Sequence, residues 1–144
     1  MTNVTLSVRG ANVAKRWSIT LWAAQIALAG LFGLAGTMKL SMAPTELFMV
    51  GLNYAVDIPY ALLLFIGVSE VAGALGVIIP ALTRIMPFLT PLAALGLATI
   101  QVLALGFHYR RGELAEMAPM NLALLALSLF VAWGRASKAP IPAR

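Results

Sequence analysis

The sequence has no cysteine and only five acidic residues among its 144 residues. Without cysteine, the chain itself supplies no disulfide, no thiolate nucleophile and no cysteine-ligated metal site. Charged residues make up 10% of the chain and apolar residues 61%, whereas soluble domains carry about 25% charged residues. A soluble domain of this length could not bury so much apolar surface. The composition therefore predicts a single-domain integral membrane protein.

Metal centres and nucleic acid are poorly supported by the remaining residues. His108 is the only histidine in the sequence, whereas a metal site normally needs three or four ligands, so no metal is predicted. No Ser-His-Asp set, phosphate loop or dinucleotide fingerprint occurs. The net charge of +5 comes from basic residues at the ends of apolar runs. That placement indicates the lipid bilayer as partner, not nucleic acid.

Four apolar runs have about the length needed to span lipid as helices, which is roughly 20 residues. We expect helices over about 18–39, 58–79, 85–108 and 118–134, the last run being the shortest. None of the runs alternates as barrel strands do. The predicted fold is an all-α, four-helix transmembrane bundle over residues 17–135. Pro80 is expected to end the second helix, and the short loop after it predicts antiparallel neighbouring helices.

The distribution of basic residues predicts the orientation. The two tails and the loop after the second helix hold no acid but seven basic residues, Arg9, Lys15, Arg16, Arg84, Arg135, Lys138 and Arg144. By the positive-inside rule, the N-terminal tail 1–16 and the C-terminal tail 136–144 lie in the cytoplasm. The C-terminal tail is expected to be disordered. The connection over 40–57 is moderately apolar, and it either lies on the outer surface or folds back over the bundle.

Each predicted helix carries polar side chains on one face. These are Gln25 and Lys39, then Glu70, then Gln101 and His108, and finally Asn121. Small residues flank several of them and allow close helix approach in lipid, so the polar faces should look inward. At about 1.5 Å per residue, Glu70 lies near mid-membrane. The pattern predicts a polar pocket in the outer half of the bundle with Glu70 at its floor.

Glu70 is the sharpest functional signal. An ionised carboxylate at the bilayer centre costs roughly 2.5 kcal/mol or more, so Glu70 must be paired, hydrated or protonated. The candidate catalytic residues are Glu70, Lys39 and His108, and the candidate ligand-binding residues are Gln101, Asn121, Tyr54 and Arg110. Structural interpretations stay open: helix packing for Glu70, snorkelling for Lys39, an interfacial cluster around His108 and interhelical hydrogen bonds for the amides.

Short motifs at these positions resemble the DoxX-like family of bacterial membrane proteins. The motifs are Gly36–Leu40, Gly67–Gly73, Phe107–Arg111, Asn121 and Val131–Arg135, and the similarity covers about residues 17–135. The resemblance implies a four-helix bundle in the bacterial inner membrane, here with both termini inside. Some relatives are linked to quinone-dependent sulfur oxidation, or to membrane complexes that handle thiol and superoxide stress.

Three functions are compatible with this sequence. The favoured hypothesis is a small redox-associated membrane subunit or enzyme acting on a quinone or another lipophilic molecule, with Glu70, Lys39 and His108 moving protons or holding a polar head group. The first alternative is a proton-coupled small-molecule transporter, working as a homo-oligomer. The second is a non-catalytic membrane anchor or assembly factor.

Overall fold

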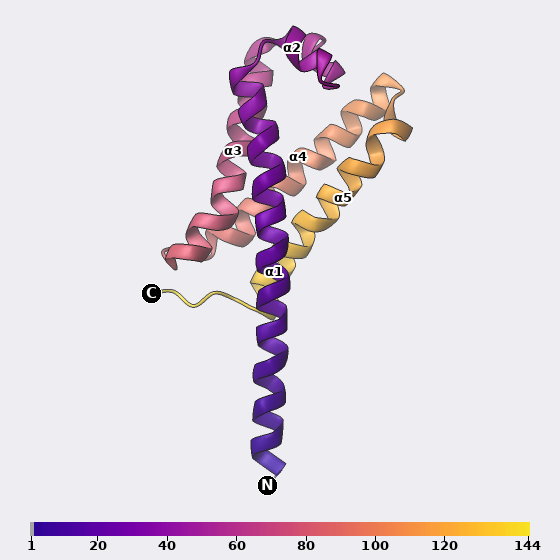
Figure 1. The fold of residues 1–144 in the computed structure, drawn as a ribbon. Coiled ribbons are helices and arrows are strands. Elements are labelled where there is room, and N and C mark those ends of the chain that lie inside the picture. The colour runs from indigo at the N-terminus through magenta and orange to yellow at the C-terminus, as the bar shows by residue number, and fades with distance from the viewer. Residues whose placement is uncertain (1) are drawn as a thin grey trace.

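The structure, a computed structural model, describes residues 2–144, with side chains described from residue 10 onward. Its regular elements are all helical (Figure 1). They are α1 (Thr2–Ser41), α2 (Pro44–Met49), the 3-10 helix η1 (Asn53–Val56), α3 (Tyr60–Thr83), α4 (Leu89–Arg111), α5 (Leu114–Trp133) and the π-helical turn η2 (Gly134–Lys138). The described range contains no strand, which confirms the all-α class.

Four helical segments are long and apolar enough to cross a membrane. They are Gly10–Ser41, Tyr60–Thr83, Leu89–Arg111 and Leu114–Lys138. Large apolar side chains such as Phe65, Leu82 and Leu103 point outward and are more than 60% exposed, which suits contact with lipid acyl chains. The number of long apolar helices agrees with the prediction. The first helix also takes in residues 2–16, which the sequence analysis assigned to a tail.

Pro80 does not end α3, so that prediction is wrong. The helix continues to Thr83, and the amide nitrogen of Arg84 donates to the carbonyl oxygen of Pro80 at 3.0 Å. Proline lacks an amide donor, but its carbonyl accepts normally, so the turn that follows it can close. The helix ends instead at Arg84, whose φ of 61° is left-handed, as is common just past a helix C-terminus.

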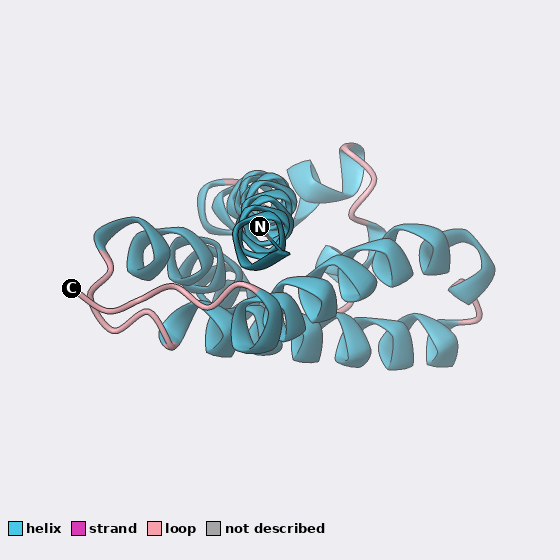
Figure 2. Cartoon of the chain, turned by 90° about the horizontal axis from the view of Figure 1, so that it is seen from below, coloured by secondary structure: helices cyan, strands magenta, loops and turns pink. Residues whose placement is uncertain are grey.

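The long helices pack as two pairs (Figures 1 and 2). Helix α1 lies along α3, α4 lies along α5, and contacts between α3 and α4 join the pairs. Helix α1 also meets α5 where Trp17 packs against Phe130 and Trp133, with ring centroids 6.1 and 5.6 Å apart. The main core between the helices is apolar and contains Leu28, Phe32, Val77, Leu97 and Val131.

The connection between α1 and α3 folds back over one end of the bundle. Leu47 of α2 and Ala55 of η1 are buried against Leu63 of α3 in a small apolar cluster. This resolves the two alternatives for residues 40–57 in favour of folding back. We call this end, where α2 and η1 lie, the cap end, and the opposite end, where Arg84 and η2 lie, the terminal end (Figure 1).

The C-terminal tail begins later than predicted. Helix α5 continues past Trp133 as the turn η2, closed by the amide of Ala139 donating to the carbonyl of Gly134 at 2.9 Å. Residues 136–138 are therefore helical, because a wider π-type turn extends the helix across Gly134. Residues 139–144 have no regular secondary structure, and the amide of Arg144 donates to the carbonyl of Arg84 at 3.1 Å.

Candidate functional site

A buried ion pair joins α1 to α3 toward the cap end. The Lys39 Nζ lies 2.7 Å from the Glu70 Oε2, and the two side chains are only 3% and 7% exposed. The ammonium also lies 3.4 Å from the carbonyl oxygen of Ala35. The structure therefore brings together two of the three predicted catalytic residues. A hydrogen bond between two charged groups is strong in an apolar setting. The ion pair with Lys39 therefore explains how Glu70 is accommodated within helices that can span lipid.

Two glycines bring the helices close enough for this pair. A Cβ atom on Gly36 would lie 2.8 Å from the carbonyl oxygen of Gly67 and 3.0 Å from the Glu70 Cβ. A Cβ atom on Gly67 would lie 3.1 Å from the carbonyl oxygen of Gly36. Residues with no side chain let two helix backbones touch in this way. The Gly36–Gly67 crossing thus sets the spacing over which Lys39 reaches Glu70.

Tyr54 of η1 is the third group at the ion pair. Burial raises the pKa of its hydroxyl more than the nearby Lys39 ammonium and its hydrogen bond lower that pKa, and the Glu70 charge adds to the rise. The hydroxyl therefore keeps its proton throughout the neutral pH range. Tyr54 also reaches α4, because its ring meets the His108 ring edge-on at a centroid distance of 5.8 Å. Tyr54 connects the ion pair to the end of α4.

His108 is buried but belongs to a different polar cluster. Its Nδ1 lies 2.8 Å from the Glu113 Oε1, and no hydrogen bond or ion pair joins His108 to Glu70 within the described residues. In the described structure His108 therefore meets Glu113 and not Glu70, and its predicted catalytic role stays a prediction. The cause is local: Gly112, with a left-handed φ of 74°, turns the chain back so that Glu113 meets the last turn of α4.

Arg111, not Arg110, ties this cluster to the cap end. The Arg111 Nε donates to the Glu113 Oε1 at 2.7 Å, and its Nη1 donates to the Asp57 carboxylate beside η1. Arg110 is exposed and has no polar partner among the described side chains. The ligand-binding role predicted for Arg110 stays a prediction, whereas the structure places Arg111 in the polar cluster. The acids in the two connections at this end, Asp57 and Glu113, were the signal that could have identified Arg111.

The two predicted amide ligands are not hydrogen-bonded to the ion pair. Asn121 is half-buried and donates to the carbonyl oxygen of Met117 in its own helix at 3.1 Å. Gln101 is 4% exposed, and its Oε1 has no hydrogen-bond partner in the described part of the chain. The Gln101 Oε1 is thus a hydrogen-bond acceptor inside the bundle that no described residue pairs with. The Asn121 amide is hydrogen-bonded within its own helix.

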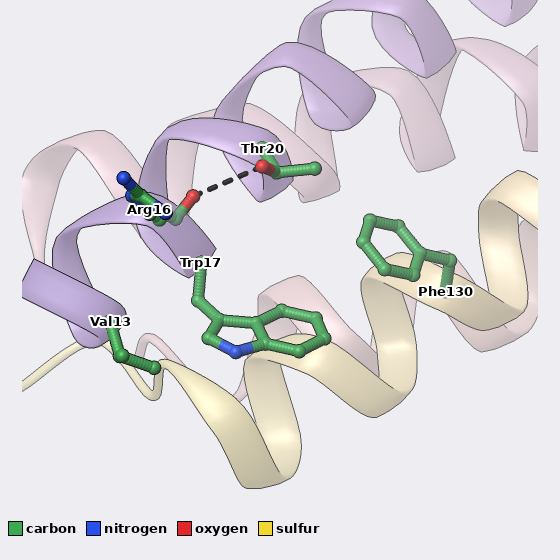
Figure 3. A pocket seen from close by; sticks show the side chains of 5 residues that line it. All are labelled: Val13, Arg16, Trp17, Thr20 and Phe130. Carbon is green, nitrogen blue, oxygen red and sulfur yellow. Dashed lines mark hydrogen bonds between the residues drawn. The ribbon is translucent and has the colours of Figure 1, made fainter.

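Two hollows in the described part of the structure lie away from Glu70. One, of about 450 Å³, lies between α1 and α5 near the terminal end and is lined by Val13, Arg16, Trp17, Thr20 and Phe130. In Figure 3 the Trp17 indole lies toward Phe130, and the Arg16 side chain points away from it. The other, of about 560 Å³, lies between α4 and α5. Neither of these two hollows is lined by Lys39 or Glu70, so neither has Glu70 at its floor.

A second buried polar cluster, at the terminal end, was missed by the sequence analysis. Arg135, counted there among the cytoplasmic tail and loop residues that set orientation, is only 4% exposed. Its Nε donates to the Gln25 Oε1 at 2.6 Å, and the Gln25 Nε2 donates to the carbonyl oxygen of Val77. Gln25 thereby links α1, α3 and η2. Arg135 is buried because η2 continues the helical path of α5 across Gly134 and turns the side chain inward.

Acid should weaken the cap end through Glu113. Hydrogen bonds from His108 and Arg111 hold the pKa of the Glu113 carboxyl below its usual range. A lowered pKa in the folded state stabilises the protein above the unfolded-state value, and this stabilisation is lost as the pH falls through the folded-state pKa. We expect thermal stability to fall below about pH 4.5, and Glu113→Gln to flatten that part of the profile. An unchanged profile in Glu113→Gln would contradict the assignment.

These features define a helical membrane protein with a buried acid–base pair at a glycine crossing. The chain belongs to the DoxX-like family, because the model of that family matches residues 23–131, and the resemblance seen in the sequence is confirmed. The match includes Gln25, Lys39, Glu70 and His108 and stops before Arg135. No curated protein and no solved structure matches the chain.

Proposed function

We propose that this DoxX-like protein is a small redox-associated membrane subunit that binds a quinone, or a similar lipophilic carbonyl compound, at Lys39, Glu70 and Tyr54. The observation that carries the proposal is the buried 2.7 Å contact between the Lys39 ammonium and the Glu70 carboxylate. The ammonium and the Tyr54 hydroxyl are donors that a carbonyl oxygen accepts, and the carboxylate can accept a proton. The set of groups therefore fits the polar head of a quinone.

In the proposed chemistry this protein handles the protons, and a redox partner protein supplies the electrons. A bound quinone would supply two-electron, two-proton redox chemistry, with the electrons coming from a redox partner protein. Lys39 would hold the carbonyl oxygen, Tyr54 would donate a proton beside it, and Glu70 would exchange protons with the cap end. Tyr54 suits this role because its hydroxyl is protonated at neutral pH.

In this proposal a ligand would reach the ion pair when the connection over residues 42–59 moves, since neither of the two hollows described above reaches it. This connection is held by the small cluster of Leu47, Ala55 and Leu63 and by the Asp57–Arg111 ion pair. The Asp57 side chain is 49% exposed, and exposed ion pairs contribute little stability. Moving this connection away from the bundle would therefore expose much less buried surface than separating the helices at the main core.

The same proposal includes a membrane orientation. The four helices would cross the bacterial inner membrane as antiparallel neighbours, with both termini in the cytoplasm. The charge distribution supports this: acids occur only between residues 46 and 116, whereas Lys15, Arg16, Arg84, Lys138 and Arg144 leave the terminal end strongly basic. Basic residues accumulate on the cytoplasmic side of membrane proteins.

Quinone binding to the purified protein in lipid nanodiscs tests the function. We expect Tyr54→Phe to weaken binding of a short-chain ubiquinone analogue about tenfold, and Lys39→Met/Glu70→Leu to abolish it, because charge-assisted hydrogen bonds contribute about 1.5–3 kcal/mol each. The matched control is Glu116→Gln, an exposed carboxylate at the cap end, which should bind normally. Equal binding by all four proteins would refute the proposal.

Proton-coupled transport is the second candidate, and one observation favours it. The described residues place no other carboxylate within ion-pair distance of Lys39, so protonation of Glu70 would break the only ionic contact between α1 and α3. Such a coupling of proton uptake to helix separation is what a transporter needs. A pH step across proteoliposomes would drive flux in the wild type and not in Lys39→Met/Glu70→Leu. Flux without quinone binding would favour this candidate over the first.

A further inference from the structure

Arg135 carries a buried positive charge that no described carboxylate neutralises. It is 4% exposed, and none of the four ion pairs of the described residues includes it. The five acids of the chain all lie between residues 46 and 116, and among the described residues their ion pairs are with Lys39, His108 or Arg111. A buried charge without a counter-ion is strongly unfavourable, so an anion bound beside Arg135 would stabilise the terminal end.

The hydrogen bonds of the Arg135 guanidinium leave one side of it free. The Nε donates to the Gln25 Oε1 at 2.6 Å, and the Nη1 donates to the carbonyl oxygen of Ala139 at 3.2 Å. The guanidinium carbon lies 5.5 Å from the centroid of the Trp22 ring. The Nη2 is buried and has no partner within the described residues. Gln25 and Trp22 thus fix the plane of the guanidinium, and the Nη1–Nη2 edge faces the tail.

We propose that Arg135 is the anchor of a phosphate-binding site at the terminal end, and that the carbonyl of Ala139 occupies this site when no ligand is bound. The Nη1–Nη2 edge of an arginine binds two oxygens of a phosphate through parallel hydrogen bonds. The weaker partner, at 3.2 Å, is the Ala139 carbonyl. A phosphate would displace it, satisfy the Nη2 and supply the missing negative charge.

The segment that covers the site is suited to being displaced. Residues 139–144 have no regular secondary structure, and a single backbone hydrogen bond, from Arg144 to Arg84, holds the end of the segment. Arg84 and Arg144 add positive charge at the same end of the molecule. Their field would raise the local concentration of anions around Arg135.

The position of Arg135 favours the phosphate of an anionic phospholipid. Trp17 and Trp133 lie at this end of the long helices, where tryptophan marks the boundary between lipid and water. The 560 Å³ hollow is almost wholly apolar and is lined by Phe88, Pro91, Leu92, Leu95, Leu129, Ala132, Trp133 and Ala136. Trp133 and Ala136 flank Arg135 in sequence, so an acyl chain in this hollow would keep its head group near the site.

Lipid selection by the full-length protein tests the inference. Wild type, Arg135→Gln and Lys138→Gln are purified in a neutral detergent and offered phosphatidylglycerol and phosphatidylcholine in equal amounts, and retained lipid is counted by native mass spectrometry. We expect wild type to retain phosphatidylglycerol in preference to phosphatidylcholine. The ratio of the two retained lipids should fall about tenfold in Arg135→Gln. The exposed Lys138 is the matched control: its variant loses the same charge three residues away and should keep the preference within about twofold.

Two measurements on the wild type keep the test decisive if Arg135→Gln does not fold. Hydrogen exchange at the amide of Arg144, which is bonded to the carbonyl of Arg84, should speed up when phosphatidylglycerol is added, because the tail leaves the guanidinium. A rise in thermal stability with inorganic phosphate alone, at matched ionic strength against chloride, would support the same site with free phosphate as its ligand. The inference is overturned if wild type shows no preference for the anionic lipid and no response to phosphate, or if a folded Arg135→Gln keeps the full preference.

Discussion

Glu70→Leu should destabilise the protein by about 3 kcal/mol, and Lys39→Met by a similar amount. Each change leaves one charged group buried, at 3% and 5% exposure for Lys39 and Glu70, without its partner. Removing one member of a buried ion pair typically costs 3–5 kcal/mol, mostly because the remaining charge is uncompensated. Reversible unfolding in mixed micelles of mild detergent and dodecyl sulfate, followed by tryptophan fluorescence, measures the change.

The double variant Lys39→Met/Glu70→Leu should recover most of this loss. Replacing a buried ion pair by apolar side chains of similar volume is often neutral or stabilising, by up to about 4 kcal/mol. The three unfolding free energies form a double-mutant cycle whose coupling term reports the pair directly. Additive effects of the two single changes would show that the carboxylate and the ammonium do not meet. Loss of quinone binding in a stable double variant would separate function from folding.

Gly36→Ala should destabilise the crossing of α1 and α3 by about 1–3 kcal/mol, the range for overpacking a close contact. The new Cβ would lie 2.8 Å from a backbone oxygen of α3 and 2.8 Å from the Val71 Cγ2. The backbone cannot yield as a flexible side-chain end does, so the helices must separate. The control is Gly30→Ala in the same helix, where a Cβ meets nothing within 4 Å. That change should stabilise by about 0.5–1 kcal/mol, because alanine favours the helix.

Disulfide cross-linking measures the helix separation itself. A Cβ on Gly33 would lie 3.7 Å from the Ala74 Cβ, within the spacing of about 3.5–4.5 Å that a disulfide spans. Because the chain has no cysteine, Gly33→Cys/Ala74→Cys gives a single reporter pair. Cross-linking should be fast in this background and several-fold slower when Gly36→Ala is added. Equal rates would mean that Gly36 does not set the distance between α1 and α3.

The helical architecture was predictable because it rests on composition and run length. Long apolar runs leave few alternatives in lipid, where each backbone polar group must be bonded within its own helix. The ends were less predictable. Pro80 removes one hydrogen bond to the preceding turn, but the helix continues past it, and the carbonyl of Pro80 accepts from Arg84. Similarly, Gly134 continues into a π-type turn, which no sequence pattern indicated.

The ion pair was predictable in part, and its surroundings were not. Lys39 and Glu70 stood out because charges within apolar helices need partners. The choice of partner depends on how the chain turns: Gly112 brings Glu113 to the Nδ1 of His108, and the described residues show no hydrogen bond between His108 and Glu70. The burial of Arg135 depends on a side chain 110 residues away in sequence, Gln25. Contacts of that range follow from helix packing, which the pattern of one sequence does not determine.

Helix α1 is longer than the hydrocarbon layer is thick, so a small tilt of the helix produces a large displacement at its N-terminal tip. Its 40 residues extend about 60 Å at 1.5 Å per residue, whereas the hydrocarbon layer is about 30 Å thick. Its N-terminal part projects beyond the other helices (Figure 1). Because the helix is continuous, a tilt of about 5° at the Lys39 contact would sweep the far tip by about 5 Å. A ligand event at Glu70 could therefore be sensed by a protein bound to that tip.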